Sequence, residues 1–287
     1  MKFALMWANH DWTDIHPARR GVTPARLYPG AVTPTRFHEI ADHVIARYFP
    51  HPAYWRVDGR PYFSIYDLNQ FLASFGGVAA ARQAIVDFRA HARKAGVGEI
   101  HLNAVAWGRP ILPGERVPVA IESLIGDLGF DSATSYVWVH HVALPELVTD
   151  YDWVRDRYLE HAVKLATRLD VPYYPNVSIG WDPSPRCHLD DDYGTEGYPF
   201  SATIGGNTPT RFGNALRRVE PLLAILPPSQ RIVTINSWNE WTEGSYLEPD
   251  THHGMGYLEA LRATRGHEDH REVEETTRGS GERGVME

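Results

Sequence analysis

Segments rich in apolar and β-branched residues alternate with segments of helical periodicity along most of this chain, and this alternation constrains the fold more than any other feature. We predict strands at residues 3–9, 61–67, 99–106, 130–136, 173–178 and 232–237. We predict helices at residues 35–49, 78–95, 117–126, 149–169, 208–226 and 256–265, with Thr149 as the cap of the fourth. Six strand–helix units of this length predict a parallel sheet with the helices outside it.

The length of the chain fits one domain followed by a tail of different composition. Barrels built from strand–helix units commonly form one domain of roughly 250 residues, so we expect a single domain over residues 1–266. Residues 267–287 hold seven acidic residues and three arginines, which is −4 of the chain's net charge of −8. With so little apolar surface to bury, they are predicted to be a disordered acidic tail.

The segment 232–244 (IVTINSWNEWTEG) changes abruptly from a buried strand to a polar and aromatic tip. Glu240 and Glu243 would point to opposite faces of an extended strand, but they share one side if the chain tightens into a helical turn. Two carboxyls beside indoles can divide acid and base roles, because apolar walls raise one pKa while amides and water hold the other group ionised. The alternative is that the two glutamates only open a helix and the tryptophans fill core.

Four motifs, in order along the chain, resemble glycoside hydrolase family 99 and its WbsX-type relatives, which are found in polysaccharide gene clusters. They are FALMWANHDWT (3–13), VDGRPYFSIY (57–66), GWDPSPR (180–186), and WNEWTEG (238–244) followed by LEPD (247–250). The resemblance implies a (β/α)₈ barrel of the TIM type. The family's barrel has two strands before the Trp-Ala-Asn motif, so we expect about six units here, with the first two missing and two open sheet edges.

The resemblance also implies a mechanism and a set of site residues. Family members retain configuration by a substrate-assisted route, in which Glu240 would deprotonate the sugar's 2-hydroxyl and Glu243 would protonate the leaving oxygen. Polar and aromatic residues at the expected strand ends form the candidate substrate-binding set: Trp7, Asn9, Trp12, Tyr66, Trp107, Tyr136, Asn176, Trp181, Asn236, Trp238, Asn239 and Trp241. For Asn9, a purely structural role at the strand end is an equal alternative.

One departure from the family pattern lies in the first motif. Family 99-like domains read Asn-Glu-Asn where this chain has Asn9, His10 and Asp11, so the role of that glutamate is open here. His10 is either a hydrogen-bonding replacement or a structural residue.

We predict no metal and no cofactor. The pairs His140–His141 and His252–His253 lack the spacing of metal ligands, since adjacent histidines in a strand point opposite ways. Asp190, Asp191 and Asp192 fit a solvated turn better than a calcium loop.

Composition limits the partners. The net charge of −8 argues against a nucleic-acid or anionic-membrane partner, and the sequence has no apolar run approaching the roughly 18 residues of a membrane span. A single cysteine, Cys187, fits a reducing compartment, and we expect a cytoplasmic location.

The chain has 9 Trp and 14 Tyr, which suits stacking on the rings of an oligo- or polysaccharide substrate. The sequence predicts no particular oligomeric state.

Three functions therefore remain open at the level of sequence. The first is a retaining glycoside hydrolase acting on an α-mannoside-like or related polysaccharide linkage. The second is a WbsX-type glycosyltransferase of polysaccharide biosynthesis that uses the same site, although no nucleotide-phosphate motif is visible. The third is an inactive carbohydrate-binding remnant of a barrel.

Overall fold

The computed structural model describes residues 1–116 and 120–264, so the predicted tail at 267–287 lies outside the described residues. Its main sheet joins parallel strands in chain order: β1 (Leu5–Trp7), β5 (Arg60–Ile65), β6 (His101–Val105), β7 (Ser132–Thr134) and β9 (Tyr173–Tyr174). The short β4 (Arg56–Val57) pairs antiparallel with β5. A separate parallel pair, β10 (Asn176–Ser178) and β12 (Thr234–Asn236), continues the same order. All six predicted strands are therefore confirmed.

Pro175 divides the fifth predicted strand into two. A proline has no backbone N–H for a sheet ladder, and β9 ends before this residue while β10 begins after it. The carbonyl of Pro175 still accepts a hydrogen bond from the backbone of Thr234 over 3.0 Å. The strand thus changes partner at the proline, from β7 on one side to β12 on the other.

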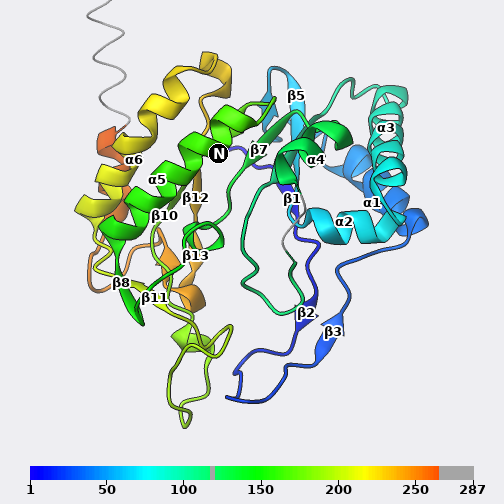
Figure 1. Cartoon of the computed structure of the whole chain (residues 1–287). Helices are drawn as coiled ribbons and strands as arrows, with labels where there is room; N and C mark the ends of the chain where they lie inside the picture. Colours follow the sequence, from blue (N-terminus) through cyan, green and yellow to red (C-terminus); the bar gives the residue numbers. More distant parts are fainter. Residues whose placement is uncertain (117–119, 265–287) are drawn as a thin grey trace, which may run out of the picture.

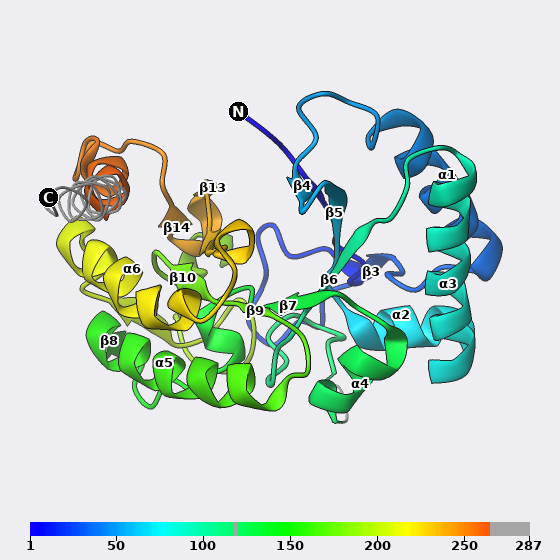
Figure 2. The ribbon, with the colours of Figure 1, turned by 90° about the horizontal axis from the view of Figure 1, so that it is seen from above.

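The strands form an open arc with the helices on its outer side, as seen from above in Figure 2. The parallel direction and the sequential strand order agree with the predicted barrel type. Within residues 1–116 and 120–264, however, no ladder joins β1 to β12, so a closed barrel is not found. The prediction that two units are missing stays a prediction.

The helices lie where the periodicity predicts them, with one addition. Their bounds are α1 (Pro34–Arg47), α2 (Leu68–Phe75), α3 (Val78–Lys94), α4 (Ile121–Leu128), α5 (Tyr151–Arg168) and α6 (Pro209–Ala224), and a further helix begins at Gly256. In Figure 1, α1–α4 cover one half of the arc and α5 with α6 cover the other. We did not predict α2, and residues 117–119 of the third predicted helix lie outside the described residues.

The N-cap of helix α5 differs from the predicted residue, Thr149. The N-cap is Asp150, whose carboxylate accepts from the backbone N–H groups of Asp152 and Trp153, whereas the hydroxyl of Thr149 donates to the carbonyl of Glu146. A carboxylate at this position satisfies two free N–H groups and also favours the helix dipole, so it replaces the neighbouring hydroxyl as cap.

Aromatic side chains fill the layer between the strands and the first helices. Phe37 of α1 packs edge-on against Phe71 of α2 and Phe88 of α3, at ring-centroid distances of 5.5 and 6.1 Å. All three are 1% exposed or less. Full burial of such a side chain contributes about 1.5–3 kcal/mol, so this cluster holds α1, α2 and α3 on the outer face of the sheet.

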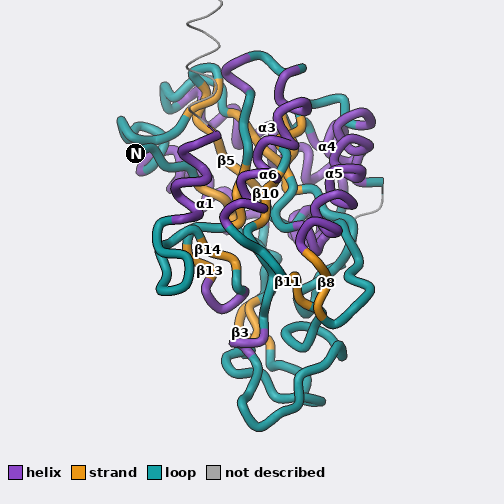
Figure 3. The backbone as a smooth tube through the Cα atoms, turned by 90° about the vertical axis from the view of Figure 1, so that its left-hand side faces the viewer, coloured by secondary structure: helices purple, strands orange, loops and turns teal. Residues whose placement is uncertain are grey.

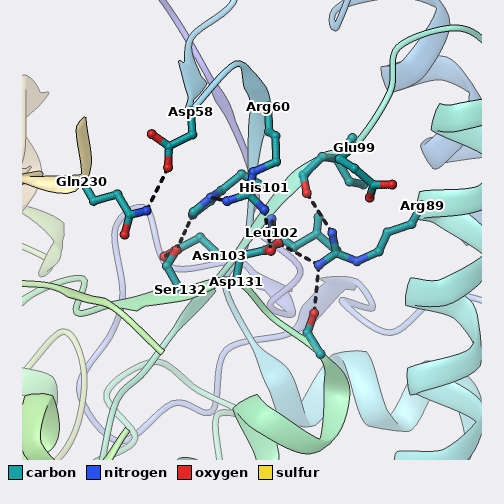
Figure 4. Close-up of polar contacts among 12 residues, drawn as sticks. Asp58, Arg60, Arg89, Glu99, His101, Leu102, Asn103, Asp131, Ser132 and Gln230 are labelled. Carbon is teal, nitrogen blue, oxygen red and sulfur yellow. Dashed lines mark hydrogen bonds and ion pairs between the residues drawn. The ribbon is translucent and has the colours of Figure 1, made fainter. Parts of the chain in front are cut away.

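A polar network joins the amino-terminal ends of the strands, opposite to the predicted site (Figure 4). The carboxylate of Asp131 binds Arg60 at 2.8 Å and Arg89 of α3 at 2.7 Å. His101, the first residue of β6, accepts from Arg60 over 3.1 Å through Nδ1 and contacts the hydroxyl of Ser132 over 2.8 Å through Nε2. Because Arg60 can only donate, Nδ1 must be unprotonated, and His101 is the neutral Nε2–H tautomer.

At the other end of the strands, long loops and short hairpins extend away from the helices (Figure 3). They contain the antiparallel pair of β2 (Trp12–Thr13) and β3 (Arg26–Tyr28), the parallel pair of β8 (Val148–Asp150) and β11 (Thr203–Gly205), and the antiparallel pair of β13 (Asn239–Glu240) and β14 (Ser245–Tyr246). Four 3₁₀ segments are described: η1 (Trp138–His140), η2 (Ser184–Arg186), η3 (Pro228–Gln230) and η4 (Trp241–Glu243). In the described part of the chain, no helix combines the length and the hydropathy needed to span a membrane.

Candidate active site

The two predicted carboxylates lie in a tight hairpin directly after β12. Glu240 ends β13, the turn η4 follows, and Gly244 closes the turn at a φ of 59° before β14 begins. A glycine adopts this left-handed conformation without steric cost. The hydroxyl of Ser237 accepts from the backbone N–H of Glu240 over 3.1 Å and donates to the carbonyl of Ser245 over 2.8 Å. The chain thus tightens after Trp238, as predicted, and both glutamates face the same side.

Arg186, the last residue of η2, binds both carboxylates. Its Nη2 donates to Oε1 of Glu240 over 2.7 Å, and its Nη1 donates to Oε1 of Glu243 over 2.8 Å. The side chain of Arg186 is 11% exposed, that of Glu243 9%, and that of Glu240 36%. A planar guanidinium presents donors in a fixed fork, so Arg186 sets the relative position of the two acids.

Tyr198 is a third partner of the buried acid. Its hydroxyl donates to Oε1 of Glu243 over 2.8 Å and also contacts Nη1 of Arg186. Thr242 links the remaining guanidinium nitrogen, since its hydroxyl accepts from Nε of Arg186 over 2.9 Å. Within the described residues, every protein hydrogen bond to the two carboxylates ends on Oε1, so Oε2 of each is available to a ligand.

The two acids have different environments. Burial raises the pKa of Glu243, and the neighbouring carboxylate of Glu240 acts in the same direction. The charge of Arg186 and the hydrogen bond from Tyr198 oppose this rise in the pKa of Glu243. A buried carboxyl with a raised pKa beside a more exposed one is the arrangement in which one group donates a proton and the other accepts one.

Both acids line a cavity of about 510 Å³ at the carboxyl ends of the strands. The opposite wall comes from the end of β1, the segment after it and the β2–β3 hairpin. The lining residues are Met6, Ala8, His10, Asp11, Trp12, Thr13, Asp14, Ile15, His16, Leu27, Tyr66, Leu112, Tyr136, Arg186, Glu240 and Glu243. With four carboxylates and a single arginine, this lining favours a neutral ligand over an anionic one.

A buried acid orients one wall of the cavity. The hydroxyl of Tyr66 donates to Oε1 of Glu115 over 2.9 Å. Oε2 of Glu115 accepts from the backbone of Ile111 and Leu112 and lies 3.4 Å from Nε2 of His140. Because the proton of Tyr66 is directed to Glu115, its oxygen can accept a hydrogen bond from a ligand hydroxyl.

The structure brings five predicted residues together at this cavity: Glu240, Glu243, Trp12, Tyr66 and Tyr136. Trp12 is 60% exposed, which leaves its indole face accessible to a ligand. Their roles in catalysis and binding stay predictions.

Trp7 and Asn9 do not reach the cavity. Successive side chains of a strand alternate between its faces, and Trp7 points outward to pack on Phe37 at a centroid distance of 5.6 Å. Asn9 is 2% exposed, and its amide bonds the backbone carbonyl and N–H of Asp67 at 2.7 and 2.8 Å. These bonds give Asn9 a structural role, while Trp7 and Asn9 both line a neighbouring cavity, and their part in substrate binding stays a prediction.

Four further predicted residues are buried outside this cavity. Asn176 and Asn236 line a smaller cavity of about 200 Å³ inside the arc, below the site. Trp107 lies beneath Tyr66 and donates to its carbonyl over 3.2 Å. Trp181 lines a different cavity and packs near Tyr198, with ring centroids 6.0 Å apart. None of the four lines the cavity that holds Glu240 and Glu243, and their part in substrate binding stays a prediction.

The remaining three predicted residues lie on the outside of the hairpin. Trp238 is 51% exposed and Trp241 42% exposed, and Asn239 is exposed as well. Trp241 stacks on Tyr246 at a centroid distance of 3.7 Å and donates to Glu248 over 2.6 Å. None of the three lines the cavity that holds Glu240 and Glu243.

Sequence analysis missed Arg186, Tyr198 and Glu115 as members of the site. Arg186 is the last residue of the third motif, GWDPSPR, and its place in that motif could have identified it as a candidate site residue. Tyr198 and Glu115 belong to no motif or periodic segment, and only tertiary contacts bring them to the site.

In the described ranges, no group of three or more His, Cys, Asp or Glu side chains is arranged to hold a metal. The acidic turn at 190–192 faces arginines. Asp191 accepts from the backbone of Arg20 over 2.7 Å and lies 3.4 Å from the guanidinium of Arg19. Those arginines contact carboxylate oxygens of Asp191 that a calcium ion would need as free ligands.

Comparison with known families gives one match that covers almost the whole chain. Residues 1–261 match the model of the family described as Glycosyltransferase WbsX. Two curated relatives, both described as uncharacterized protein WxcX, come from two strains of Xanthomonas campestris pv. campestris. They are 30% and 31% identical over 284 residues, which is 91% of this chain. The chain spans 34% of the length of each relative.

Solved structures show a similar fold at low sequence identity. A glycoside hydrolase-like protein aligns with a TM-score of 0.54 at 14% identity, covering 80% of this chain and 61% of its own. A family 99 endo-α-mannosidase from Bacteroides thetaiotaomicron, solved with bis-tris-propane, aligns with a TM-score of 0.49 at 14% identity. That alignment covers 85% of this chain and 68% of the mannosidase.

Proposed function

This chain belongs to the family described as Glycosyltransferase WbsX, and from the geometry of its site we propose that it is a carbohydrate-active enzyme that hydrolyses glycosidic bonds. The observation that carries the proposal is the pair Glu240 and Glu243, clamped by Arg186 at the wall of a cavity, with Oε2 of each acid available. We place the reacting sugar in this cavity, with Tyr66, Tyr136 and Trp12 around it. An α-mannoside-like or related polysaccharide is the proposed substrate class.

The proposed reaction proceeds in two balanced steps with retention of configuration. Glu240 takes the proton of the sugar's 2-hydroxyl, and the oxygen bonds to the anomeric carbon as the glycosidic C–O bond breaks. Glu243 gives its proton to the leaving oxygen, which yields a 1,2-anhydro sugar. Water then attacks the anomeric carbon and loses a proton to Glu243, while the proton on Glu240 returns to the 2-oxygen. This differs from the usual retaining pair, in which a carboxylate attacks carbon directly.

The unequal environments of the acids support these roles. Glu243 is buried and its burial raises its pKa, which suits a group that must carry a proton before reaction. Glu240 is more exposed, and Arg186 binds the same carboxylate oxygen in both residues. The positive charge of Arg186 can therefore stabilise whichever of the two carboxylates is ionised at each step of the reaction.

The family's description keeps a second function open, namely glycosyl transfer from a nucleotide sugar. The lining of the cavity argues against it, because the carboxylates of Asp11, Asp14 and Glu240 would repel a donor diphosphate. A third possibility, carbohydrate binding without turnover, would leave the carboxylates without a chemical role.

Incubation of the purified chain with a panel of bacterial polysaccharides distinguishes these functions. We expect new reducing ends without any added donor, and an initial product of unchanged anomeric configuration by NMR. Products that form only with a nucleotide sugar would establish transfer instead. Binding without products would establish the non-catalytic function.

A further inference from the structure

The β2–β3 hairpin presents an aromatic surface at the rim of the cavity. Trp12 and Tyr28 are directly paired across the two antiparallel strands. They are 60% and 67% exposed, and Leu27 beside them is 53% exposed. Large apolar side chains that stay accessible next to a ligand cavity are characteristic of a recognition surface.

Trp12 borders two cavities. The cavity that holds Glu240 and Glu243 measures about 510 Å³, and a second cavity of about 360 Å³ lies next to it. The two share Ala8, His10 and Trp12 in their linings. The second cavity therefore adjoins the first at these three residues.

The second cavity has a fixed floor. Gly30 approaches the end of β1 so closely that a Cβ there would lie 2.4 Å from the carbonyl oxygen of Asn9. The backbone N–H of Gly30 donates to Asp11 over 2.8 Å, and Asn9 is bonded to Asp67 on both sides of its amide. A floor held by these bonds is preformed, so ligand binding there requires little ordering.

The chemistry of this second cavity fits a neutral sugar ring. Among residues 1–116 and 120–264, no acidic or basic side chain other than His10 lines it, and its remaining lining is Trp7, Ala8, Asn9, Trp12, Tyr28, Pro29, Gly30 and Val32. Nδ1 of His10 lies 3.0 Å from the carbonyl of Asp11, so it carries the proton, and in the neutral ring Nε2 is an acceptor for a hydroxyl. Aromatic faces bind the apolar C–H faces of sugar rings, while an acceptor sets their orientation.

We propose that this cavity is a second sugar subsite, which binds the neighbouring unit of the same glycan chain beside the cavity of the carboxylates, with Trp12 shared between the two subsites. The proposal rests on the proposed function and deepens it, because the substrate is then an oligo- or polysaccharide that crosses the hairpin. Trp12 contacts both units, Tyr28 only the second.

The test uses binding rather than turnover. Affinity electrophoresis of the full chain selects a neutral bacterial polysaccharide that retards its migration, and mild acid hydrolysis of that polymer supplies oligosaccharides of one to six units. Calorimetric titration in the Glu243→Gln background then compares chain lengths. We expect affinity to rise with length until both subsites are filled. Tyr28→Ala should weaken the longer chains about 10-fold and leave the single sugar unchanged, while Trp12→Ala should weaken both.

Trp153→Ala is the matched control, because Trp153 is an exposed tryptophan on α5 that stacks with Arg157, away from both cavities. Oxidation by N-bromosuccinimide adds a readout at single residues, and bound oligosaccharide should protect Trp12 but not Trp153. Unchanged affinity of long chains in Tyr28→Ala would overturn the subsite. Binding with the expected length dependence but no products would overturn only the proposed function, and failure of every polymer to retard the chain would count against both.

Discussion

The hydroxyl of Tyr198 donates to Oε1 of Glu243 over 2.8 Å, on the same oxygen that Arg186 binds. This bond stabilises the ionised form of a buried carboxyl, so it lowers the pKa of Glu243 against the rise that burial causes. The loop that carries Tyr198 thereby adjusts the acid of the proposed reaction from a position 45 residues away in the sequence.

Tyr198→Phe should shift the pH profile of activity upward. Activity that needs protonated Glu243 is lost as pH rises through its pKa, and removal of the hydrogen bond raises that pKa. We expect the alkaline limb of kcat/KM to move up by about one pH unit. Tyr193→Phe is the control, since the Tyr193 hydroxyl bonds the carbonyl of Ser201. A shift to lower pH, or none, would contradict the assigned role of Tyr198.

Arg186→Lys should lower kcat/KM by about 10²-fold or more. Lysine carries one compact charge and cannot reproduce two parallel bonds to Oε1 of Glu240 and Oε1 of Glu243. Initial rates and circular dichroism together separate loss of the clamp from loss of the fold. Arg211→Lys, which alters an ion pair with Asp150 at the cap of α5, should retain full rates. Retention of activity in Arg186→Lys would remove the clamp from the mechanism.

The strands could be predicted because each is a short apolar run bounded by polar residues or turns, and the parallel order followed from the intervening helices. Helix α2 was missed because it begins directly after β5, with only Tyr66 and the N-cap Asp67 between them. Its apolar residues therefore follow those of the strand without a separating loop, and no separate helical segment is visible in the sequence. The β2–β3 and β13–β14 hairpins have too few paired residues to leave a periodic pattern.

The carboxylates of the site could be predicted and much of its lining could not. Glu240 and Glu243 lie in one short segment, whereas Arg186 and Tyr198 reach them from a separate loop. Trp7 was assigned to the site because it ends a strand, but the direction of its side chain depends on strand register, and register follows from pairing with β5. Local patterns carry no information on such tertiary relationships.

The network at the amino ends of the strands predicts a pH dependence of stability. Burial lowers the pKa of His101 to about 4 from 6.5, with Arg60 acting in the same direction and Asp131 opposing it. The unfolded chain therefore binds a proton between these values while the folded chain does not. The free energy of unfolding should fall as pH decreases from about 6.5 to about 4, by roughly 3 kcal/mol at most.

Urea titrations from pH 4 to pH 7 test this dependence, and His101→Gln should flatten it. His43→Gln, at an exposed position of α1, serves as the control and should keep the slope of the parent chain. An equal slope in His101→Gln would show that other groups cause the dependence.

Glu243→Gln should slow substrates with poor leaving groups far more than activated aryl glycosides. Protonation matters little when the leaving group is already stable, and general acid catalysis typically supplies about 10²- to 10⁴-fold. Comparison of kcat/KM on polysaccharide and on an aryl glycoside measures the difference. Glu259→Gln, at an exposed helical position, should leave both rates unchanged. Equal losses on both substrates would exclude Glu243 as the acid.

The last prediction concerns the chemistry at Glu240. If the sugar's own 2-hydroxyl is the nucleophile, a substrate with hydrogen or fluorine at that carbon cannot form the anhydro sugar. It should bind without turnover, and mass spectrometry should find no covalent adduct. An ordinary retaining enzyme would be trapped by the 2-fluoro compound as a glycosyl-enzyme. Glu240→Gln should abolish turnover of natural and activated substrates alike, because the base is needed whatever group leaves. A glycosyl ester on Glu240, formed from the 2-fluoro substrate and found by mass spectrometry, would refute the substrate-assisted route. It would keep the hydrolase function, since the same carboxylate would then be the direct nucleophile.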